Sequence, residues 1–247
     1  MGNSPLVSYT RISPNKTIPR SHKIDTITIH CVVGKCSVET LGTIFAPASR
    51  KASSNYGIGP DGRIGMYVEE KDRSWCSSNA ANDHRAITIE VASETTHPYS
   101  VPDAAYKSLI ELLTDICKRN GIEKLLWKGD KTLIGNISEQ NMTVHRWFSN
   151  TACPGDYLYE RQGDIAEKVN AKLGASNDAC KPYKVKITIS DLNIRTGPGT
   201  NYEKTGKFTG KGVFTITEVR AGKGSTAGWG RLKSGVGWIS LDYATKV

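Results

Sequence analysis

The sequence contains no long apolar run. The sequence has 247 residues, and no segment of it approaches the roughly 18 consecutive apolar residues that a membrane span needs. The first residues, Met1 to Leu6, also lack the apolar core of a secretory signal. We therefore expect a chain that is made in the cytoplasm without a signal peptide and is not stably inserted into a membrane.

Regularly spaced cysteines are missing as well. The six cysteines stand at positions 31, 36, 76, 117, 153 and 180, and no interval repeats. Without an export signal, such a set argues against a framework of disulfide bonds. Most of these cysteines are expected to be small buried side chains.

Acidic residues are scarce at the C-terminal end. Residues 181–247 carry 12 Lys or Arg against 4 Asp or Glu, whereas residues 1–180 carry 21 against 20. A basic tail suits a polyanion such as a nucleic acid, an anionic lipid or an anionic cell-wall polymer. Nucleic acid is not expected as the partner, because the tail lacks the interleaved aromatic and basic residues of single-strand binding proteins.

The residue pattern changes near Gly174, where helical periodicity ends and a short polar stretch leads to Pro182. We expect a first domain over residues 1–174, a linker over 175–183 and a second domain over 184–247. The first alternates β-like runs with helical patterns, which indicates an α/β fold. The second has short alternating runs between glycine-rich turns, which indicates a small all-β barrel.

Several elements of the first domain can be placed by periodicity. Strands are expected over residues 24–33, 86–92 and 142–145. Helices are expected over residues 37–45 with Ser37 as N-cap, from near Pro102 to Asn120-Gly121, and from about Asp156 to Leu173. In the second domain, runs over residues 185–189 and 213–219 are the clearest strands.

Three of these strands end in the same pattern: Thr28-Ile29-His30, Thr88-Ile89-Glu90 and Thr143-Val144-His145. Since side chains alternate between the two faces of a strand, His30, Glu90 and His145 are expected to share one face. Cys153 follows His145 in a turn that opens the last helix. Two imidazoles, one thiolate and an open fourth position are typical of a catalytic zinc site.

Other interpretations of these residues stay open at this point. A lone strand histidine is more often a packed residue than a metal ligand. Cys36 could act as a nucleophile with His145 as its base, but its surroundings match no cysteine peptidase signature. His84 and His97 stand in polar loops and are expected at the surface. Cys31 directly follows His30 and is expected to face the apolar layer.

Five segments occur in the order seen in the zinc N-acetylmuramoyl-L-alanine amidases, a family that includes peptidoglycan recognition proteins and many phage endolysins. They are Ile29-His30, residues 54–58, Ile89-Glu90, Val144-His145-Arg146 and residues 153–156. Residues 20–173 therefore resemble this family, and clostridial phage endolysins in particular. The resemblance implies a mixed central sheet flanked by helices, with zinc in a groove along one face.

The resemblance also implies roles for single residues. The zinc ligands would be His30, His145 and Cys153. Glu90 matches a glutamate that serves as general base, and Tyr56 matches a tyrosine that contacts the reacting centre. Thr151 stands where some relatives carry a lysine, so that its hydroxyl could bond a developing oxyanion without adding charge. The implied reaction is hydrolysis of the amide between N-acetylmuramic acid and L-alanine.

Residues 184–247 resemble bacterial SH3-like domains. The opening signature covers residues 191–202, and residues 228–232 and 237–239 fit the closing strands. The resemblance implies binding to peptidoglycan or to an anionic wall polymer, which would tether the enzyme to its substrate. Arg195, Tyr202 and Trp229 are expected to line the groove, and Trp238 to lie in the core.

The most direct interpretation is a phage endolysin that reaches the cell wall after holin-type release, with a host autolysin as the alternative. A peptidoglycan-binding receptor that has kept the fold and lost catalysis is the rival of a different class, and an adaptor that acts through the barrel alone is a third. Non-catalytic relatives commonly replace the zinc cysteine. Here Cys153, His30, His145, Tyr56 and Glu90 are all present, which favours the enzyme.

Overall fold

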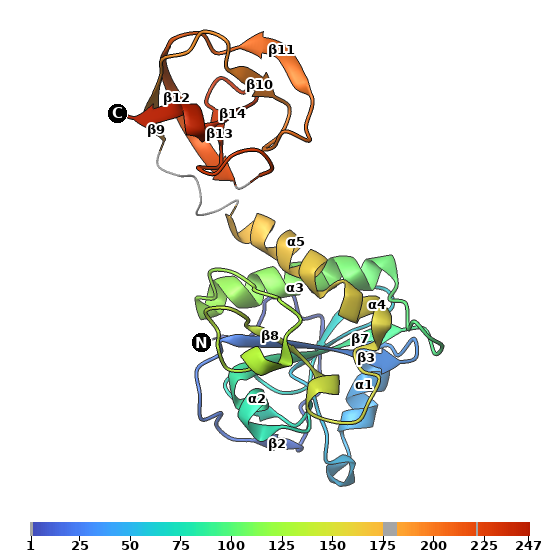
Figure 1. Ribbon diagram of the computed structural model, residues 1–247. Coiled ribbons are helices and arrows are strands. Elements are labelled where there is room, and N and C mark those ends of the chain that lie inside the picture. The colour runs from blue at the N-terminus through green and yellow to red at the C-terminus, as the bar shows by residue number, and fades with distance from the viewer. Residues whose placement is uncertain (1, 175–181, 221) are drawn as a thin grey trace. The chain divides into compact units, whose positions relative to one another are not determined.

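The computed structural model describes residues 2–174, 182–220 and 222–247, and it divides into two compact units, Met1–Leu173 and Gly174–Val247 (Figure 1). Most of the linker predicted over residues 175–183 lies outside the described residues. Among the described residues, no helix combines the length and the apolar character that crossing a bilayer requires.

The first unit is built on a six-stranded mixed sheet in the order β1-β5-β4-β7-β3-β8. Its strands are β1 (Tyr9–Thr10), β3 (Thr26–Val33), β4 (Tyr56–Ile58), β5 (Ile64–Met66), β7 (Ala86–Ser93) and β8 (Met142–Val144). The two central strands, β3 and β7, run parallel and in register along eight residue pairs. Both are rich in β-branched residues, which pack well on a sheet that is buried on both faces.

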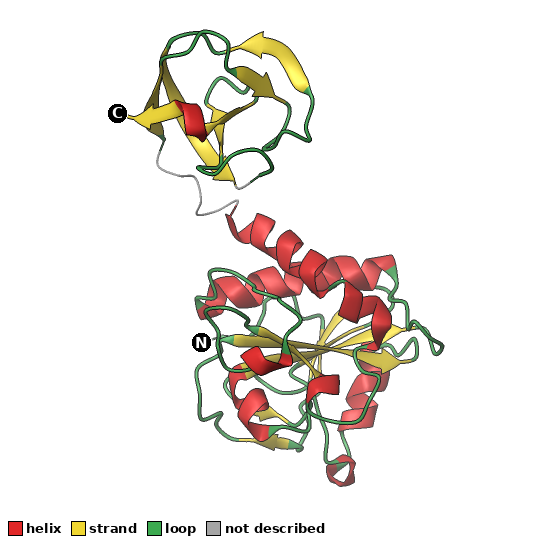
Figure 2. Ribbon diagram, viewed as in Figure 1, coloured by secondary structure: helices red, strands yellow, loops and turns green. Residues whose placement is uncertain are grey.

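Helices cover both faces of this sheet (Figures 1 and 2). They are α1 (Val38–Phe45), α2 (Ala80–Arg85), α3 (Asp103–Asn120), α4 (Gly155–Glu160) and α5 (Gln162–Gly174). Figure 1 shows α3 and α5 on one side of the sheet and α1 and α2 on the other. The main apolar core lies beneath α3 and α5, where Leu109 and Val169 belong to one cluster with Ile29 and Ile89.

Short elements complete the first unit. They are the paired strands β2 (Lys16–Thr17) and β6 (Arg73–Ser74) and the 3-10 turns η1 (Ala48–Arg50), η2 (Lys131–Leu133) and η3 (His145–Trp147).

Two predicted helix ends are confirmed. The Ser37 hydroxyl accepts a hydrogen bond from the backbone N–H of Thr40 and so caps α1. Helix α3 ends at Gly121, whose φ of 68° is the left-handed conformation that glycine adopts most readily.

The helix predicted from Asp156 to Leu173 is instead two helices, broken at Arg161. The guanidinium of Arg161 donates to the carbonyl of Tyr157, and its own backbone N–H bonds to Leu158, three residues back. The regular helical bond to Tyr157 is therefore lost. The strand predicted over residues 142–145 is also one residue shorter, because His145 begins η3.

The second unit is a seven-stranded sheet in the order β11-β10-β14-β13-β12-β9-β15, and all of its strand pairs are antiparallel. Its elements are β9 (Tyr183–Ile187), β10 (Asn193–Arg195), β11 (Lys204–Phe208), β12 (Gly212–Arg220), β13 (Trp229–Leu232), β14 (Trp238–Ser240), η4 (Leu241–Tyr243) and β15 (Ala244–Lys246). Ile187, Ile216 and Ile239 form its small apolar core. An all-β second unit agrees with the prediction, and Trp238 is buried as expected.

Candidate metal centre

The pairing of β3 with β7 sets the faces of the sheet. His30 lies beside Glu90 and Ile29 lies beside Ile89 in the register of the two parallel strands. Ile29 and Ile89 belong to the core beneath α3 and α5. Because side chains alternate along a strand, His30 and Glu90 point to the opposite face.

His145 and Cys153 meet His30 on that face. One ligand atom from each of the three residues lies within 4.8 Å of the others. The Sγ of Cys153 is 3.3 Å from the Nδ1 of His30, and the two imidazole centroids are 5.0 Å apart. Ligands of a tetrahedral zinc ion, with ordinary bond lengths, are about 3.3 to 3.6 Å from one another. The three predicted ligands are thus placed close enough to hold one ion.

Burial favours the neutral form of both imidazoles, which is the form that binds a metal. His30 is fully buried, and burial, with a smaller effect of His145, lowers its pKa to about 3. Its Nε2 has no hydrogen-bond partner within the described part of the chain. His145 is half-buried, and burial also lowers its pKa.

Ser78 contacts His145 from the loop before α2. Its hydroxyl is 3.2 Å from the Nε2 of His145, and its φ of 59° is uncommon for a residue other than glycine. A group that binds the second nitrogen of a ligand histidine fixes the orientation of the ring. The sequence offered no signal for this contact, because it depends on how the loop folds over the sheet.

The turn that carries Cys153 is held by its neighbours. Thr151 accepts a hydrogen bond from the backbone N–H of Cys153 through its hydroxyl, at 3.2 Å. The backbone N–H of Arg146 donates to the carbonyl of Cys153 at 3.1 Å. A hydrogen bond with Cys31, and then burial, raise the pKa of the Cys153 thiol. Cys31 is buried as expected, but it is also a direct neighbour of the predicted ligand.

Glu90 stands beside these three residues, and its carboxyl group is only partly satisfied by hydrogen bonds. Its Oε1 accepts a weak hydrogen bond from the Sγ of Cys76 at 3.8 Å, and its Oε2 has no partner among the described residues. Burial raises the pKa of Glu90 to about 7. A carboxyl group that titrates near neutral pH can both accept and return a proton.

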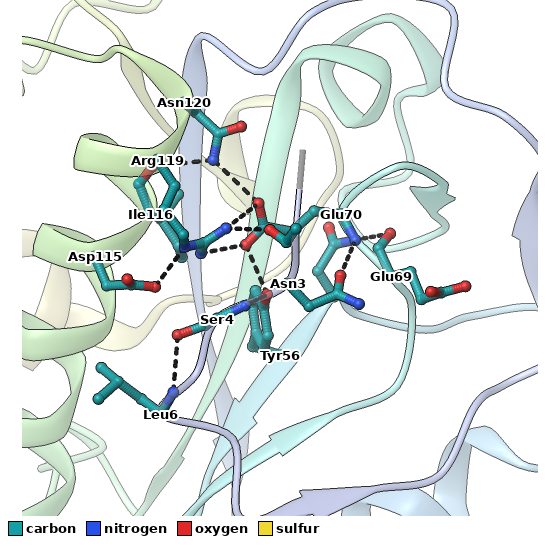
Figure 3. Close-up of polar contacts among 12 residues, drawn as sticks. Asn3, Ser4, Leu6, Tyr56, Glu69, Glu70, Asp115, Ile116, Arg119 and Asn120 are labelled. Carbon is teal, nitrogen blue, oxygen red and sulfur yellow. Dashed lines mark hydrogen bonds and ion pairs between the residues drawn. The ribbon is translucent and has the colours of Figure 1, made fainter.

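Tyr56 does not reach this group, contrary to the prediction. In the register of β4 with β7, Tyr56 lies beside Ile89 and therefore shares the face covered by α3 and α5. Its side chain is fully buried, and its hydroxyl donates to the Oε1 of Glu70 at 2.6 Å. Figure 3 shows this hydroxyl with the backbone of Ser4, which donates to it, and the guanidinium of Arg119, which binds the same carboxylate.

The three predicted binding residues of the second unit have different surroundings. Tyr202 is 43% exposed, and Arg195 donates to the carbonyls of Thr200 and Tyr202. Trp229 is only 3% exposed and lies 5.9 Å from the Arg195 guanidinium, measured to the ring centroid. Trp229 therefore cannot line an open groove, because the strands and loops around it cover its ring.

Comparisons with known proteins give several similar structures and one family. Among solved structures, a selenomethionine derivative of AmpD is 18% identical with a TM-score of 0.48 and covers 66% of this chain and 96% of its own. The endolysin amidase LysCS from Clostridium intestinale is 20% identical with a TM-score of 0.46, over 66% of this chain and 93% of its own. PlyL is 15% identical with a TM-score of 0.47, over 65% of this chain and 95% of its own.

The comparison with curated proteins found no match. The family model described as N-acetylmuramoyl-L-alanine amidase matches residues 20–156, which include His30, Glu90, His145 and Cys153. This match spans more than half of the chain, and the chain belongs to the N-acetylmuramoyl-L-alanine amidase family.

Proposed function

We propose that the chain is a zinc-dependent peptidoglycan hydrolase that cleaves the amide bond between N-acetylmuramic acid and L-alanine. The observation that carries this proposal is the position of His30, His145 and Cys153, whose ligand atoms lie within 4.8 Å of one another on the face of the sheet that also carries Glu90. Family membership supports amidase activity, and members of the family are typically zinc enzymes.

The residues present fit zinc. Two neutral imidazoles and a thiol provide nitrogen and sulfur ligands. Such a set binds zinc in preference to magnesium or calcium, which favour oxygen ligands. The Nδ1 of His30 lies 3.3 Å from the Sγ of Cys153, close to the spacing of two ligands on one zinc ion. Three protein ligands leave a fourth position for water or substrate, as catalytic zinc sites require. When bound, zinc supplies a Lewis acid that acidifies a water molecule and polarises the scissile carbonyl.

Glu90 performs the proton transfers in this proposal. Its raised pKa, about 7, allows the carboxylate to accept a proton from the attacking water near neutral pH. The same group can then protonate the leaving amine of L-alanine. Tyr56 is excluded from this step, because it lies on the other face of the sheet.

Thr151 has a positioning role in this proposal. Its hydroxyl oxygen accepts from the backbone of Cys153 and holds the turn, which leaves the hydroxyl proton free to donate to the developing oxyanion.

We propose that the second unit binds the cell wall, with peptidoglycan or an anionic wall polymer as its ligand, as expected for an SH3-like domain. Its excess of lysine and arginine supports attraction to a polyanion. Arg195 and Tyr202 are the surface residues proposed to contact the ligand, whereas Trp229 is buried near the Arg195 guanidinium.

The test is a digestion of purified bacterial cell walls. Amino groups of L-alanine should be released without new reducing ends, a chelator should stop the reaction, and added zinc should restore it. Reducing ends without free amines would contradict amidase activity. Activity that survives both the chelator and His30→Ala would contradict zinc dependence, and wall binding without any release would favour the non-catalytic receptor.

A further inference from the structure

A second group of possible metal ligands overlaps the first. His30, Cys76 and Glu90 each offer one ligand atom, and these atoms lie within 4.8 Å of one another. Cys76 stands in the loop between β6 and α2, and Glu90 lies on β7 next to His30 on β3. Neither the proposed reaction nor the family resemblance uses Cys76.

The thiol and carboxyl groups of this set lie close to the spacing of two ligands on one metal ion. The Sγ of Cys76 is 3.8 Å from the Oε1 of Glu90. A thiolate sulfur and a carboxylate oxygen on one tetrahedral zinc ion are roughly 3.6 Å apart. The corresponding distance in the first group, from Cys153 Sγ to His30 Nδ1, is 3.3 Å. Each of these two atom pairs is therefore close to the spacing that an ion would impose.

Two buried atoms in this group have no partner among the described residues. They are the Nε2 of His30 and the Oε2 of Glu90. A buried polar atom without a partner is costly, and a bound cation is one way in which such an atom is satisfied. A divalent cation that replaced the thiol proton of Cys76 would satisfy the Glu90 carboxylate.

The backbone of the Cys76 loop is held in place. The N–H of Cys76 donates to the Oδ2 of Asp83 at 3.0 Å, and the hydroxyl of Ser77 donates to the Oδ1 of the same carboxylate at 2.5 Å. The backbone N–H of Trp75 donates to Ser53. The thiol is thus presented to Glu90 by a loop that is bonded on both sides of the cysteine.

We propose that His30, Cys76 and Glu90 form a second, alternative binding set for a soft divalent cation such as Zn²⁺ or Cd²⁺. Because His30 is shared, an ion in this set competes with the one held by His145 and Cys153. Glu90 is a ligand in this second set and cannot then act as a base, so a cation bound to the set inhibits the reaction. Of these statements, only the inhibition rests on the proposed function.

Cadmium binding tests the set directly, because a cadmium–thiolate bond has its own ultraviolet absorption. In Cys153→Ser the first set has lost its thiolate, and we expect the absorption to persist and to saturate near one equivalent of Cd²⁺. It should disappear in the double variant Cys76→Ser/Cys153→Ser. The matched control is Cys36→Ser/Cys153→Ser, which removes a partly exposed thiol outside both sets and should keep the absorption. Absence of the absorption in a folded Cys153→Ser protein would overturn the proposal.

A second measurement covers the case in which Cys153→Ser does not fold. His145→Ala weakens the first set and keeps all six cysteines, so the alkylation rate of each can be followed by mass spectrometry. Because the thiolate is the reacting form, bound Cd²⁺ should slow alkylation of Cys76 by about tenfold or more and leave Cys36 unchanged. Equal alkylation of Cys76 with and without Cd²⁺ would contradict the proposal.

These readouts separate the two proposals. The cadmium absorption and the alkylation rates report metal binding without any wall digestion. Their results therefore remain valid if the chain proves to lack amidase activity. If the amidase is active and zinc-dependent but neither variant binds Cd²⁺ through Cys76, only the second set is wrong. With an active enzyme, inhibition by excess Zn²⁺ should be lost in Cys76→Ala.

Discussion

Arg146 binds Asp156 across the turn that carries Cys153. Two guanidinium nitrogens of Arg146 lie 3.0 Å from the Oδ1 of Asp156, and one of them also donates to the carbonyl of Ala152 at 2.5 Å. The backbone N–H of Arg146 donates to the carbonyl of Cys153. The residue that follows one predicted ligand, His145, thus holds the turn that presents another.

Arg146→Ala is expected to weaken zinc binding by about 10- to 100-fold, because removal of groups that orient metal ligands typically has effects of this size. Competition with a chromophoric zinc chelator would measure the change. Arg161→Ala is the matched control, since Arg161 contacts Tyr157 on α4 but not the turn. Equal zinc affinity in the wild type and Arg146→Ala would show that the turn does not need this contact.

Tyr56→Phe is expected to lower the free energy of unfolding by about 1.5 to 3 kcal/mol, because it removes a buried hydrogen bond to the Glu70 carboxylate. Zinc affinity should stay unchanged, since Tyr56 lies on the other face of the sheet. Urea unfolding and chelator competition on the same samples would test both statements. A variant with normal stability and weakened catalysis would return Tyr56 to the reacting centre.

Asp242 should make the second unit sensitive to acid. The backbone N–H of Ala227 is the main group that lowers the pKa of Asp242, to about 2. A carboxyl whose pKa is lower in the folded than in the unfolded state stabilises the fold above its unfolded pKa of about 3.9, and this contribution is lost as the pH falls toward 2. Hydrogen exchange in β13 and β14 should therefore increase over this range more in the wild type than in Asp242→Ala. Equal acid dependence of the two proteins would contradict the assignment.

Metal removal should destabilise the first unit alone. A ligand that binds only the folded state stabilises it by about 2.7 kcal/mol at 100 times its dissociation constant. Thermal unfolding can be monitored strand by strand through hydrogen exchange. On chelation, the unfolding temperature of β3 and β7 should fall, whereas that of β12 and β13 should not change. His30→Ala should show no response to the chelator. A shift in both units, or in neither, would contradict a zinc site confined to the first unit.

Several features of the fold followed from the local sequence. Ser37 before an apolar periodic run and Gly121 after one mark helix ends, because capping depends on a few neighbouring residues. The alternation along residues 28–30 and 88–90 placed His30 and Glu90 away from the isoleucines that precede them, because the period of a strand is a local property.

Other features required the tertiary structure. The face of the sheet on which Tyr56 lies depends on the register of β4 with β7. The sequence of β4 alone does not show which of its two faces lies on the side of the metal centre. The burial of Trp229 depends on the strands and loops that cover it. Neither could be decided from residues close in the sequence.

The sequence by itself determined the residue types of the metal centre and the face of the sheet on which His30 and Glu90 stand, since both depend on chemistry and on strand alternation. Only the tertiary structure decided that Cys76 lies against Glu90, that Ser78 contacts His145 and that Tyr56 belongs to the core. The physical reason is that each of these contacts joins segments whose approach is set by strand register and loop packing.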